Sequence, residues 1–479
     1  MEEEDFYFPD TDLDLSFTST VTDRTFASSS GRSSLTLSFN DRLSTSSAIT
    51  TSSTSTVNHR RQDPHWSAIK SAKLLSSDGT IHLRHLKLIR HLGTGNLGRV
   101  FLCNLRGDSS ARFALKVIDR NNLTTAKKLS QVETEAEILS LLDHPFLPTL
   151  YARIDESHYT CLLIDYAPNG DLHSLIRKQP GNRLPIQPVR FFAAEVLVAL
   201  EYLHAMGIVY RDLKPENVLL REDGHVMLSD FDLCFKSDVV PTFKSRRYRR
   251  TCSSSPSLRR RKSGCFSGEK KYEREEIVAE FTAEPVSAFS RSCVGTHEYL
   301  APELISVNGH GSGVDWWAFG IFLYELLYGT TPFKGGSKEQ TLRNIASSDK
   351  TVNFHVDDSD SEEARDLIEK LLVKDPRKRL GCARGAQDIK RHAFFDGIKW
   401  PLIRHYKPPE EVRGLVVKKS TRAHGGHVIA VSPRLKKWVL WRALCNLLRG
   451  KSSYGGSKNQ SNSNYYHYIG KSYASRKRV

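Results

Sequence analysis

The feature that most constrains this chain is one short polar loop and the turn that follows it. The octapeptide YRDLKPEN runs from Tyr210 to Asn217, and the SDFDL run after it places Asp230 18 positions beyond Asp212. Asp, Asn, Lys and Pro are ordinary loop residues, so the octapeptide alone could be a surface turn with incidental charges. Further motifs elsewhere in the chain are needed to distinguish a surface turn from a reactive site.

Those motifs begin with a glycine-rich hairpin. From Leu86 the run LKLIRHLGTGNLGRVFLCNL alternates apolar residues and predicts two strands joined by a tight turn. Its glycines let backbone amides approach a phosphate without interference from a Cβ, although a Gly-rich hairpin without a ligand fits equally well. Lys116, in FALKV, follows Gly98 by 18 residues on the next strand-like run, and GTHEYLAPE and DWWAFG come later.

In this order the motifs resemble the catalytic elements of serine/threonine protein kinases of the AGC group. The resemblance covers roughly residues 86 to 395, and the forms YRDLKPEN, DWWAFG and SCVGTHEYLAPE are typical of that group. It implies an α+β, two-lobed protein kinase fold with a small β-rich lobe and a large helical lobe. It also implies ATP and Mg²⁺ as cofactors and transfer of the ATP γ-phosphate to Ser or Thr.

The resemblance assigns catalytic and metal-binding roles within the two polar motifs. Phosphoryl transfer needs positioning and electrostatics rather than covalent catalysis. Asp212 would orient the substrate hydroxyl and accept its proton, and Lys214 would reach the transferred phosphate. Asn217 and Asp230 would hold magnesium.

The nucleotide site would combine the glycine-rich hairpin with residues from three later segments. Alignment on EILSLL favours Glu135 as the partner of the phosphate-binding lysine, and it leaves Glu133 and Glu137 as solvated helix charges. The full predicted set is Leu92, Gly93, Gly95, Gly98, Val100, Ala114, Lys116, Glu135, Asp165, Ala167 and Leu219.

Substrate preference and activation are also implied by the group. Acidic residues at Asp171, Glu216 and Glu325 would receive Arg or Lys upstream of the target Ser, because guanidinium and carboxylate groups pair in bidentate geometry. Each could instead be a structural ion-pair partner. Ser292, with Ser290 as a second candidate, occupies the activation phosphosite.

Four supporting residues complete the expected large lobe. Thr296 would hydrogen-bond near Asp212, Glu303 would pair with Arg379, and Asp315 would hold the backbone of the catalytic loop.

Two departures narrow the family. The metal-binding turn reads DFD, with Asp232 at a position where Gly is usual, so the turn is expected to be stiffer or differently set. In addition, 74 residues separate Asp230 from Glu303 inclusive, which predicts a mostly disordered insert at about residues 236–288. Both features resemble the PINOID/WAG subfamily of plant AGC kinases.

The insert is strongly basic. KSRRYRR and RRRKS are suited to anionic membrane lipids, at about 1 kcal/mol per charge, or to nuclear import. We rank lipid first, with a solvated charge run as the alternative. The formal net charge of +16 agrees with an anionic partner, and the expected location is the cytoplasm, peripherally at the plasma membrane, with the nucleus possible.

The two ends differ from the centre. Residues 1–82 are acidic and rich in Ser and Thr, which predicts disorder, and MEEEDFYF lacks the pattern of a signal peptide. Residues 396–479 are expected to form a tail like that of AGC kinases. Its 432–451 segment could be a basic amphipathic helix for a membrane or groove, or a helix packed on the kinase itself.

The subfamily resemblance implies a physiological role. It points to phosphorylation of Ser in the cytoplasmic loops of PIN auxin efflux carriers, promoting polar auxin transport, with an upstream activating kinase as a further partner. A pseudokinase scaffold acting through the insert and tails is the competing hypothesis. Specific nucleic-acid binding through the Arg runs is disfavoured, because no recognised nucleic-acid module accompanies them.

Overall fold

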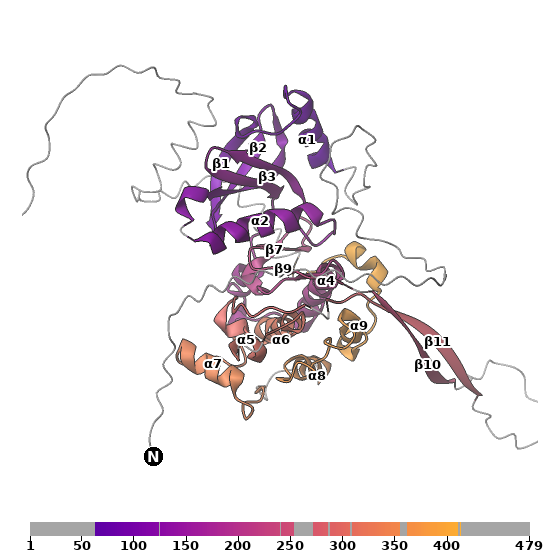
Figure 1. Cartoon of the computed structure of the whole chain (residues 1–479). Helices are drawn as coiled ribbons and strands as arrows, with labels where there is room; N and C mark the ends of the chain where they lie inside the picture. Colours follow the sequence, from indigo (N-terminus) through magenta and orange to yellow (C-terminus); the bar gives the residue numbers. More distant parts are fainter. Residues whose placement is uncertain are drawn as a thin grey trace, which may run out of the picture. The chain divides into compact units, whose positions relative to one another are not determined.

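A five-stranded antiparallel sheet forms the small lobe (Figure 1). The computed structural model describes residues 63–412, apart from 124, 240, 253–271, 286–287, 307–308, 355–361 and 411. The strands, in spatial order, are β1 (Leu86–Thr94), β2 (Arg99–Leu105), β3 (Asp108–Asp119), β5 (Tyr159–Asp165) and β4 (Leu150–Glu156). Helix α2 (Ala126–Leu141) belongs to the same lobe as this sheet. Its N-cap is Thr125, whose side chain accepts a hydrogen bond from the Lys128 amide.

Strand alternation divides this sheet into two faces with different tasks. On β3, Phe113, Leu115 and Val117 are buried in one apolar cluster, and the intervening positions face the other way. Among those, Lys116 is directed to the side where Val132 and other residues of α2 join the core of the large lobe. The sheet therefore presents one purely structural face and one face available to chemistry.

Helices α4 and α6 form the centre of the large lobe. Helix α6 begins at Gly313, and its Trp316, Trp317 and Phe319 are completely buried, which explains why the run DWWAFGIFLYELL is apolar on every side. The helices of this lobe are α3 (Leu172–Ile176), α4 (Ile186–Ala205), α5 (Pro302–Ile305), α6 (Gly313–Tyr328), α7 (Lys338–Ala346), α8 (Glu362–Leu371) and α9 (Ala386–Lys390). Its short strands are β6 (Ile208–Val209), β7 (Val218–Leu220), β8 (Val226–Leu228) and β9 (Phe235–Lys236).

Short 3₁₀ turns link these elements. They are η1 (Leu83–His85), η2 (Arg120–Asn122), η3 (Pro180–Asn182), η4 (Pro215–Asn217), η5 (His297–Tyr299), η6 (Ala393–Phe395) and η7 (Trp400–His405). The β-rich small lobe and the helical large lobe confirm the predicted α+β, two-lobed fold.

A helix precedes the small lobe, and the prediction of disorder through residue 82 is wrong there. Helix α1 (Pro64–Leu74) starts at Asp63, whose carboxylate accepts a hydrogen bond from the His65 amide, and carries Pro at its first position. Ile69 is fully buried against the structural face of the sheet, and the Trp66 ring lies 5.1 Å from that of Tyr151. Averaging composition over the whole N-terminal region concealed this local signal.

The insert contains a paired hairpin at its base. Strands β10 (Thr242–Cys252) and β11 (Tyr272–Thr282) are antiparallel, and their register places Lys244 opposite Glu280 and Arg249 opposite Glu275. The basic run KSRRYRR thus lies on a strand whose partner, YEREEIVAEF, is rich in acidic residues. The RRRKS run lies outside the described residues.

Several expectations about the ends fall outside the described part of the chain. Residues 1–62 and the 432–451 segment both lie there. Within the residues that the structure describes, no helix is both long and apolar enough to cross a membrane.

The burial of α1 leads to a test of stability. We expect Ile69→Ala to lower the free energy of unfolding by about 2–5 kcal/mol, because it removes buried methyl groups and leaves a cavity. Lys70→Ala, on the exposed side of the same helix, should change it by less than about 0.5 kcal/mol. Urea unfolding of the full chain measures both, and equal midpoints would show that α1 does not stabilise the small lobe.

Candidate active site

The catalytic loop lies between β6 and β7 and gathers its polar side chains around Asp212. The Asp212 carboxylate is only 6% exposed and accepts hydrogen bonds from Lys214 Nζ at 2.8 Å and Asn217 Nδ2 at 2.7 Å. Thr296 Oγ1, from the activation segment, donates to its other oxygen at 3.4 Å. Burial raises the pKa of Asp212 above the ordinary carboxyl value, while Lys214 opposes this effect. The loop therefore presents one fixed carboxylate that can receive a proton.

Lys116 joins the two lobes through a buried ion pair. Its Nζ lies 2.5 and 2.7 Å from the oxygens of Glu135 on α2, and 3.1 Å from Asp230 Oδ1. Burial alone would lower the pKa of Lys116, but the two carboxylates reverse the effect and raise it, so the ammonium stays charged. Glu133 pairs instead with Arg153, and Glu137 with Lys236, both at the surface.

The oxygen ligands expected for magnesium come close to the catalytic carboxylate. Asn217 donates to Asp212 through its amide nitrogen, and Asp230 is partly exposed, at 29% of its side chain. Carboxylate and amide oxygens are the donors that Mg²⁺ prefers, and this ion is typically held by one or two carboxylates together with substrate phosphates. In the described ranges, no group of three or more His, Cys, Asp or Glu side chains could hold a metal by itself. The carboxylate of Asp230 and the amide oxygen of Asn217 suit a magnesium ion that substrate phosphates also hold.

The backbone of the DFD turn has its positive φ on the first Asp and not on the second. The positive φ falls on Asp230, at 61°, whereas Asp232 is not among the described non-glycine residues with positive φ. Asp232 is 3% exposed, and its carboxylate accepts a hydrogen bond at 3.1 Å from Asn96 Nδ2, at the tip of the glycine-rich loop. Burial and the nearby Asp230 raise the pKa of Asp232. The departure from Gly thus supplies a direct contact between the two lobes.

The predicted nucleotide residues lie in the β1–β2 hairpin, β3, α2, β5 and β7, except Ala167, which follows the end of β5 by two residues. Val100 pairs with Lys116 across β2 and β3, which aligns the glycine-rich loop with the lysine. Gly98 has no room for a side chain, because an added Cβ would lie 2.4 Å from the Val117 carbonyl oxygen. The remaining predicted positions are Leu92, Gly93, Gly95, Ala114, Asp165, Ala167 and Leu219.

Two of these residues have internal contacts that limit what they can offer. The Asp165 carboxylate is buried and accepts hydrogen bonds from the Thr149 amide at 2.8 Å and Tyr151 Oη at 2.9 Å. Only the backbone of Asp165 is therefore available to an adenine. Leu219 forms an isolated bridge with Asp171, which connects β7 to the start of α3.

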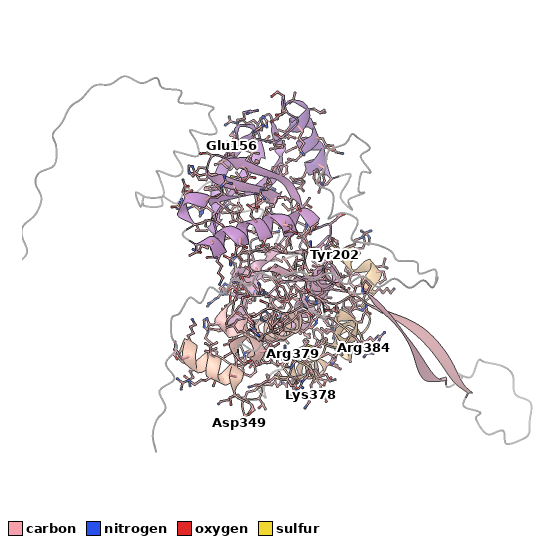
Figure 2. All side chains as sticks on the ribbon, in the orientation of Figure 1. Glu156, Tyr202, Asp349, Lys378, Arg379 and Arg384 are labelled. Carbon is pink, nitrogen blue, oxygen red and sulfur yellow. The ribbon has the colours of Figure 1, made fainter. Side chains whose placement is uncertain are left out.

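The activation segment returns to the catalytic loop through Arg211. This residue has a φ of 67°, and its Nη1 donates to Ser292 Oγ at 2.8 Å and to Ser290 Oγ at 3.2 Å. Both predicted phosphosites thus lie beside the same guanidinium. Arg379, labelled in Figure 2, is 2% exposed and forms a bidentate pair with Glu303 at 2.6 and 2.8 Å.

The three predicted substrate-recognition acids differ in how freely they can bind a cation. Asp171 caps α3, accepting hydrogen bonds from the Ser174 amide at 2.6 Å and Ser174 Oγ at 3.0 Å. Glu325 accepts a hydrogen bond from Tyr299 Oη, whereas Glu216 is exposed. Asp171 therefore already serves as a helix cap, through hydrogen bonds and not through an ion pair.

Sequence reasoning missed a fourth acid in this region. Glu298 and Glu325 line the same surface pocket of about 130 Å³, beside His173 and Lys334. Burial raises the pKa of Glu325, and the nearby Glu216 and Glu298 act in the same direction, whereas His173 lowers it. Glu298 already pairs with Lys334 at 3.4 Å. Glu298 lies within the GTHEYLAPE motif. The expected position of that motif beside the catalytic loop could have indicated that Glu298 belongs to this acidic region.

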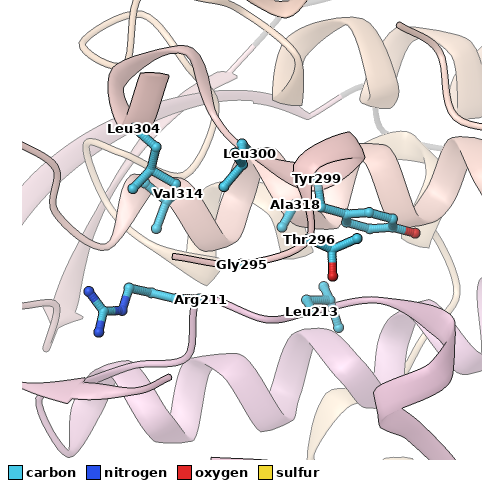
Figure 3. Close-up of a pocket in the computed structure, with 9 residues that line it drawn as sticks. All are labelled: Arg211, Leu213, Gly295, Thr296, Tyr299, Leu300, Leu304, Val314 and Ala318. Atoms are coloured by element: carbon cyan, nitrogen blue, oxygen red, sulfur yellow. The ribbon is translucent and has the colours of Figure 1, made fainter. Parts of the chain in front are cut away.

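A second, smaller pocket adjoins the catalytic loop. It lies between Arg211 and Leu213 on one side and Thr296, Leu300 and α6 on the other (Figure 3). Its volume of about 10 Å³ is close to that of a single water site, so it is a gap in the packing and not a ligand site.

Comparisons with known proteins agree with this geometry. The family model described as protein kinase domain matches residues 86–252 and 278–395. The chain is 90% identical to the serine/threonine-protein kinase WAG2 of Arabidopsis thaliana, over 100% of both chains. It is 75% identical to WAG1 of the same plant, over 98% of this chain and 99% of the relative. It is 44% identical to protein kinase PINOID 2 of Arabidopsis thaliana, over 73% of this chain and 80% of the relative.

These matches cover both lobes and the ends of the chain. The chain therefore belongs to the protein kinase family and, within it, to the WAG and PINOID group of plant serine/threonine kinases.

Proposed function

We propose that this serine/threonine kinase uses ATP and Mg²⁺ to phosphorylate Ser or Thr in basic sequence contexts, and that its substrates are the cytoplasmic loops of PIN auxin efflux carriers. The observation that carries the proposal is the acidic cluster of Glu216, Glu298 and Glu325 near the catalytic loop. The regulated process would be polar auxin transport.

The catalytic steps follow from the arrangement of the chain's own residues. Asp212 orients the substrate hydroxyl and accepts its proton, because it is fixed by Lys214 and Asn217 and burial raises its pKa. Lys116 holds the nucleotide phosphates while Glu135 keeps its side chain in place. Magnesium, held by Asn217 and Asp230, would neutralise charge that develops on the phosphates.

A preference for basic substrates has an electrostatic reason. The three carboxylates attract Arg or Lys, and the partial burial of Glu298 and Glu325 strengthens their pairings relative to fully solvated ones. Asp171 contributes its charge to this region, although its oxygens already bind Ser174. The choice of PIN carriers rests on the resemblance to the WAG kinases.

Membrane association would bring the kinase to such carriers. The basic runs of the insert suit the surface of an anionic bilayer, and we rank the plasma membrane ahead of the nucleus. The acidic strand β11 stands opposite the basic strand β10, so lipid has to compete with this internal partner. A scaffold without catalysis has no need for the joint arrangement of Lys116, Glu135, Asp212 and Asp230.

Phosphate transfer provides the direct test of the proposal. The full chain is assayed with ATP, Mg²⁺ and Ser peptides that carry upstream Arg, including PIN loop peptides. Asp230→Ala should lower the rate by roughly 100-fold or more, because it removes an electrostatic stabiliser of the transition state. Asp396→Ala, at an exposed site far along the chain, should leave the rate unchanged. Transfer to none of the peptides, even with Ser292 phosphorylated, would favour the scaffold.

Substrate selectivity can be tested separately from catalysis. For Glu325→Ala and Glu298→Ala, we expect kcat/KM on an Arg-bearing peptide to fall about 10–100-fold. Each substitution removes a carboxylate that would form a charged hydrogen bond with the arginine of the peptide. The rate on the matched peptide with Arg replaced by Ala should change little. Glu369→Ala, exposed on α8, controls for net charge. An equal loss on both peptides would assign these acids to structure alone.

The activation segment offers a third test. Ser292→Ala should lower kcat, because a phosphate at Ser292 would make charge-assisted hydrogen bonds with Arg211 and order the segment. Ser290→Ala should have the smaller effect, since its contact with Arg211 is longer. The measurement is kcat after treatment with an upstream kinase, compared with phosphatase-treated protein. Identical rates in all these preparations would remove Ser292 from activation.

A further inference from the structure

Glu284 is a buried acid that the functional motifs leave unexplained. It follows the end of β11 by two residues, where the insert returns to the large lobe, and is 8% exposed. Its Oε2 lies 2.9 Å from His204 Nδ1. Its Oε1 lies against Gly385, where an added Cβ would approach within 1.8 Å. Only glycine at residue 385 leaves room for this carboxylate.

His204 lies between two carboxylates near the end of α4. Its side chain is fully buried, and its Nε2 lies 2.9 Å from Asp315 Oδ2, on the side opposite Glu284. A carboxylate only accepts hydrogen bonds, so both ring nitrogens must carry protons and the ring is an imidazolium. Burial lowers the pKa of His204, but Glu284 and Asp315 more than reverse this and raise it to about 10.

Asp315 connects His204 to the backbone of the catalytic loop. Its Oδ2 also accepts a hydrogen bond from the Tyr210 amide, and its Oδ1 accepts one from the Arg211 amide, each at 2.8 Å. Asp212 is the next residue. The position of the catalytic carboxylate therefore depends on a side chain that His204 holds in place.

The entry of the insert attaches to the same stretch of chain. Strand β9 pairs with β6, and the Ser237 amide donates to the Gly207 carbonyl at 2.8 Å. The segment from His204 to Arg211 is thus contacted by the chain both where it enters the insert and where it leaves it. The contacts that fix the two ends of the insert therefore also fix the segment that directly precedes Asp212.

We propose that Glu284 is a positioning residue for phosphate transfer: paired with His204, it keeps the imidazolium and Asp315 fixed on the backbone of the catalytic loop, and so couples the return of the insert to Asp212. The proposal rests on the phosphotransfer activity of the family. It requires the negative charge of Glu284, and not only the volume of its side chain.

The surroundings of His204 contain few other ionisable groups. On α6 it faces Asp315 and the ring of Trp316, with ring centroids 4.6 Å apart. On the side of Glu284, burial raises the pKa of the Cys382 thiol to about 11, which keeps it neutral. Beside Gly385, Arg384 and Asp388 pair with each other. The charge of His204 is therefore controlled chiefly by its two carboxylate neighbours.

The test compares Glu284→Gln with the intact full chain as a function of pH. In the intact chain a pKa of about 10 keeps His204 charged across the assay range. Removing one carboxylate lowers that pKa, so in the variant the imidazolium is retained at low pH and lost as the pH rises. We expect the kcat ratio of variant to intact chain to be near one at pH 6. It should then fall by up to about tenfold per pH unit above the lowered pKa, with KM for ATP and peptide little changed.

Two control variants separate charge from packing. Glu284→Asp keeps the charge, so its kcat ratio should not depend on pH even if it is below one. Glu369→Gln, at an exposed site on α8, should give a ratio of one throughout. Taking ratios cancels the titration of substrate, nucleotide and Asp212. A constant ratio for Glu284→Gln would overturn the proposal, because it would show that only packing matters.

NMR of the histidine-labelled chain gives a readout independent of activity. The intact protein should show one ring, among its 18 histidines, that stays imidazolium through pH 9 and titrates at lower pH in Glu284→Gln. If every histidine of the intact chain becomes neutral by pH 9, the proposal is wrong. Should Glu284→Gln fail to fold, the intact-chain titration and Glu284→Asp still decide the question.

Discussion

Asp315 is the fixed point on which the catalytic loop depends. Its two carboxylate oxygens accept hydrogen bonds from the Tyr210 and Arg211 amides, which directly precede the predicted catalytic residue, Asp212. A buried backbone amide without an acceptor is costly, so these contacts define the path of the loop as well as stabilising it. Because Asp315 lies in the first turn of α6, whose residues are almost all buried, the loop takes its position from the core of the large lobe.

Two groups of buried charges near the catalytic loop join segments that are distant in sequence. Lys116 brings together Glu135 of the small lobe and Asp230 of the metal-binding turn. His204 brings together Asp315 of α6 and Glu284 at the end of the insert. Removing one member of such a group leaves an unpaired buried charge, at a cost of about 3–5 kcal/mol. This penalty disfavours any arrangement in which one of these charges loses its partner.

The two departures from the usual kinase pattern acquire physical roles in this setting. Asp232 contacts Asn96 of the glycine-rich loop, so the extra carboxylate of the DFD turn reaches across to the small lobe. The insert is attached at both ends to the segment preceding Asp212, through β9 and through Glu284. The fold accommodates a long insertion because both ends of the insert contact fixed residues. The entropic cost of closing a loop also increases only slowly with the length of the loop.

The sequence by itself determined the elements whose signal is local. Asp212 and Asn217 are five residues apart in one loop, and the glycine-rich hairpin and Lys116 lie on adjacent strands. These short-range motifs carried the family resemblance, and the resemblance implied the two lobes and the candidate chemistry. Helix α1 also had a local signal, Asp63 followed by Pro64, but it was hidden within a region of disordered composition.

Tertiary structure decided the contacts between residues that are distant along the chain. His204 and Glu284 are 80 residues apart, and Asn96 and Asp232 are 136 apart, so no periodicity or spacing links them. The same holds for Glu298, whose carboxylate joins Glu325 in one pocket only after α6 packs beneath the activation segment. Spacing along the chain reports which residues can share an element, whereas burial and charge pairing between elements depend on how the whole chain packs.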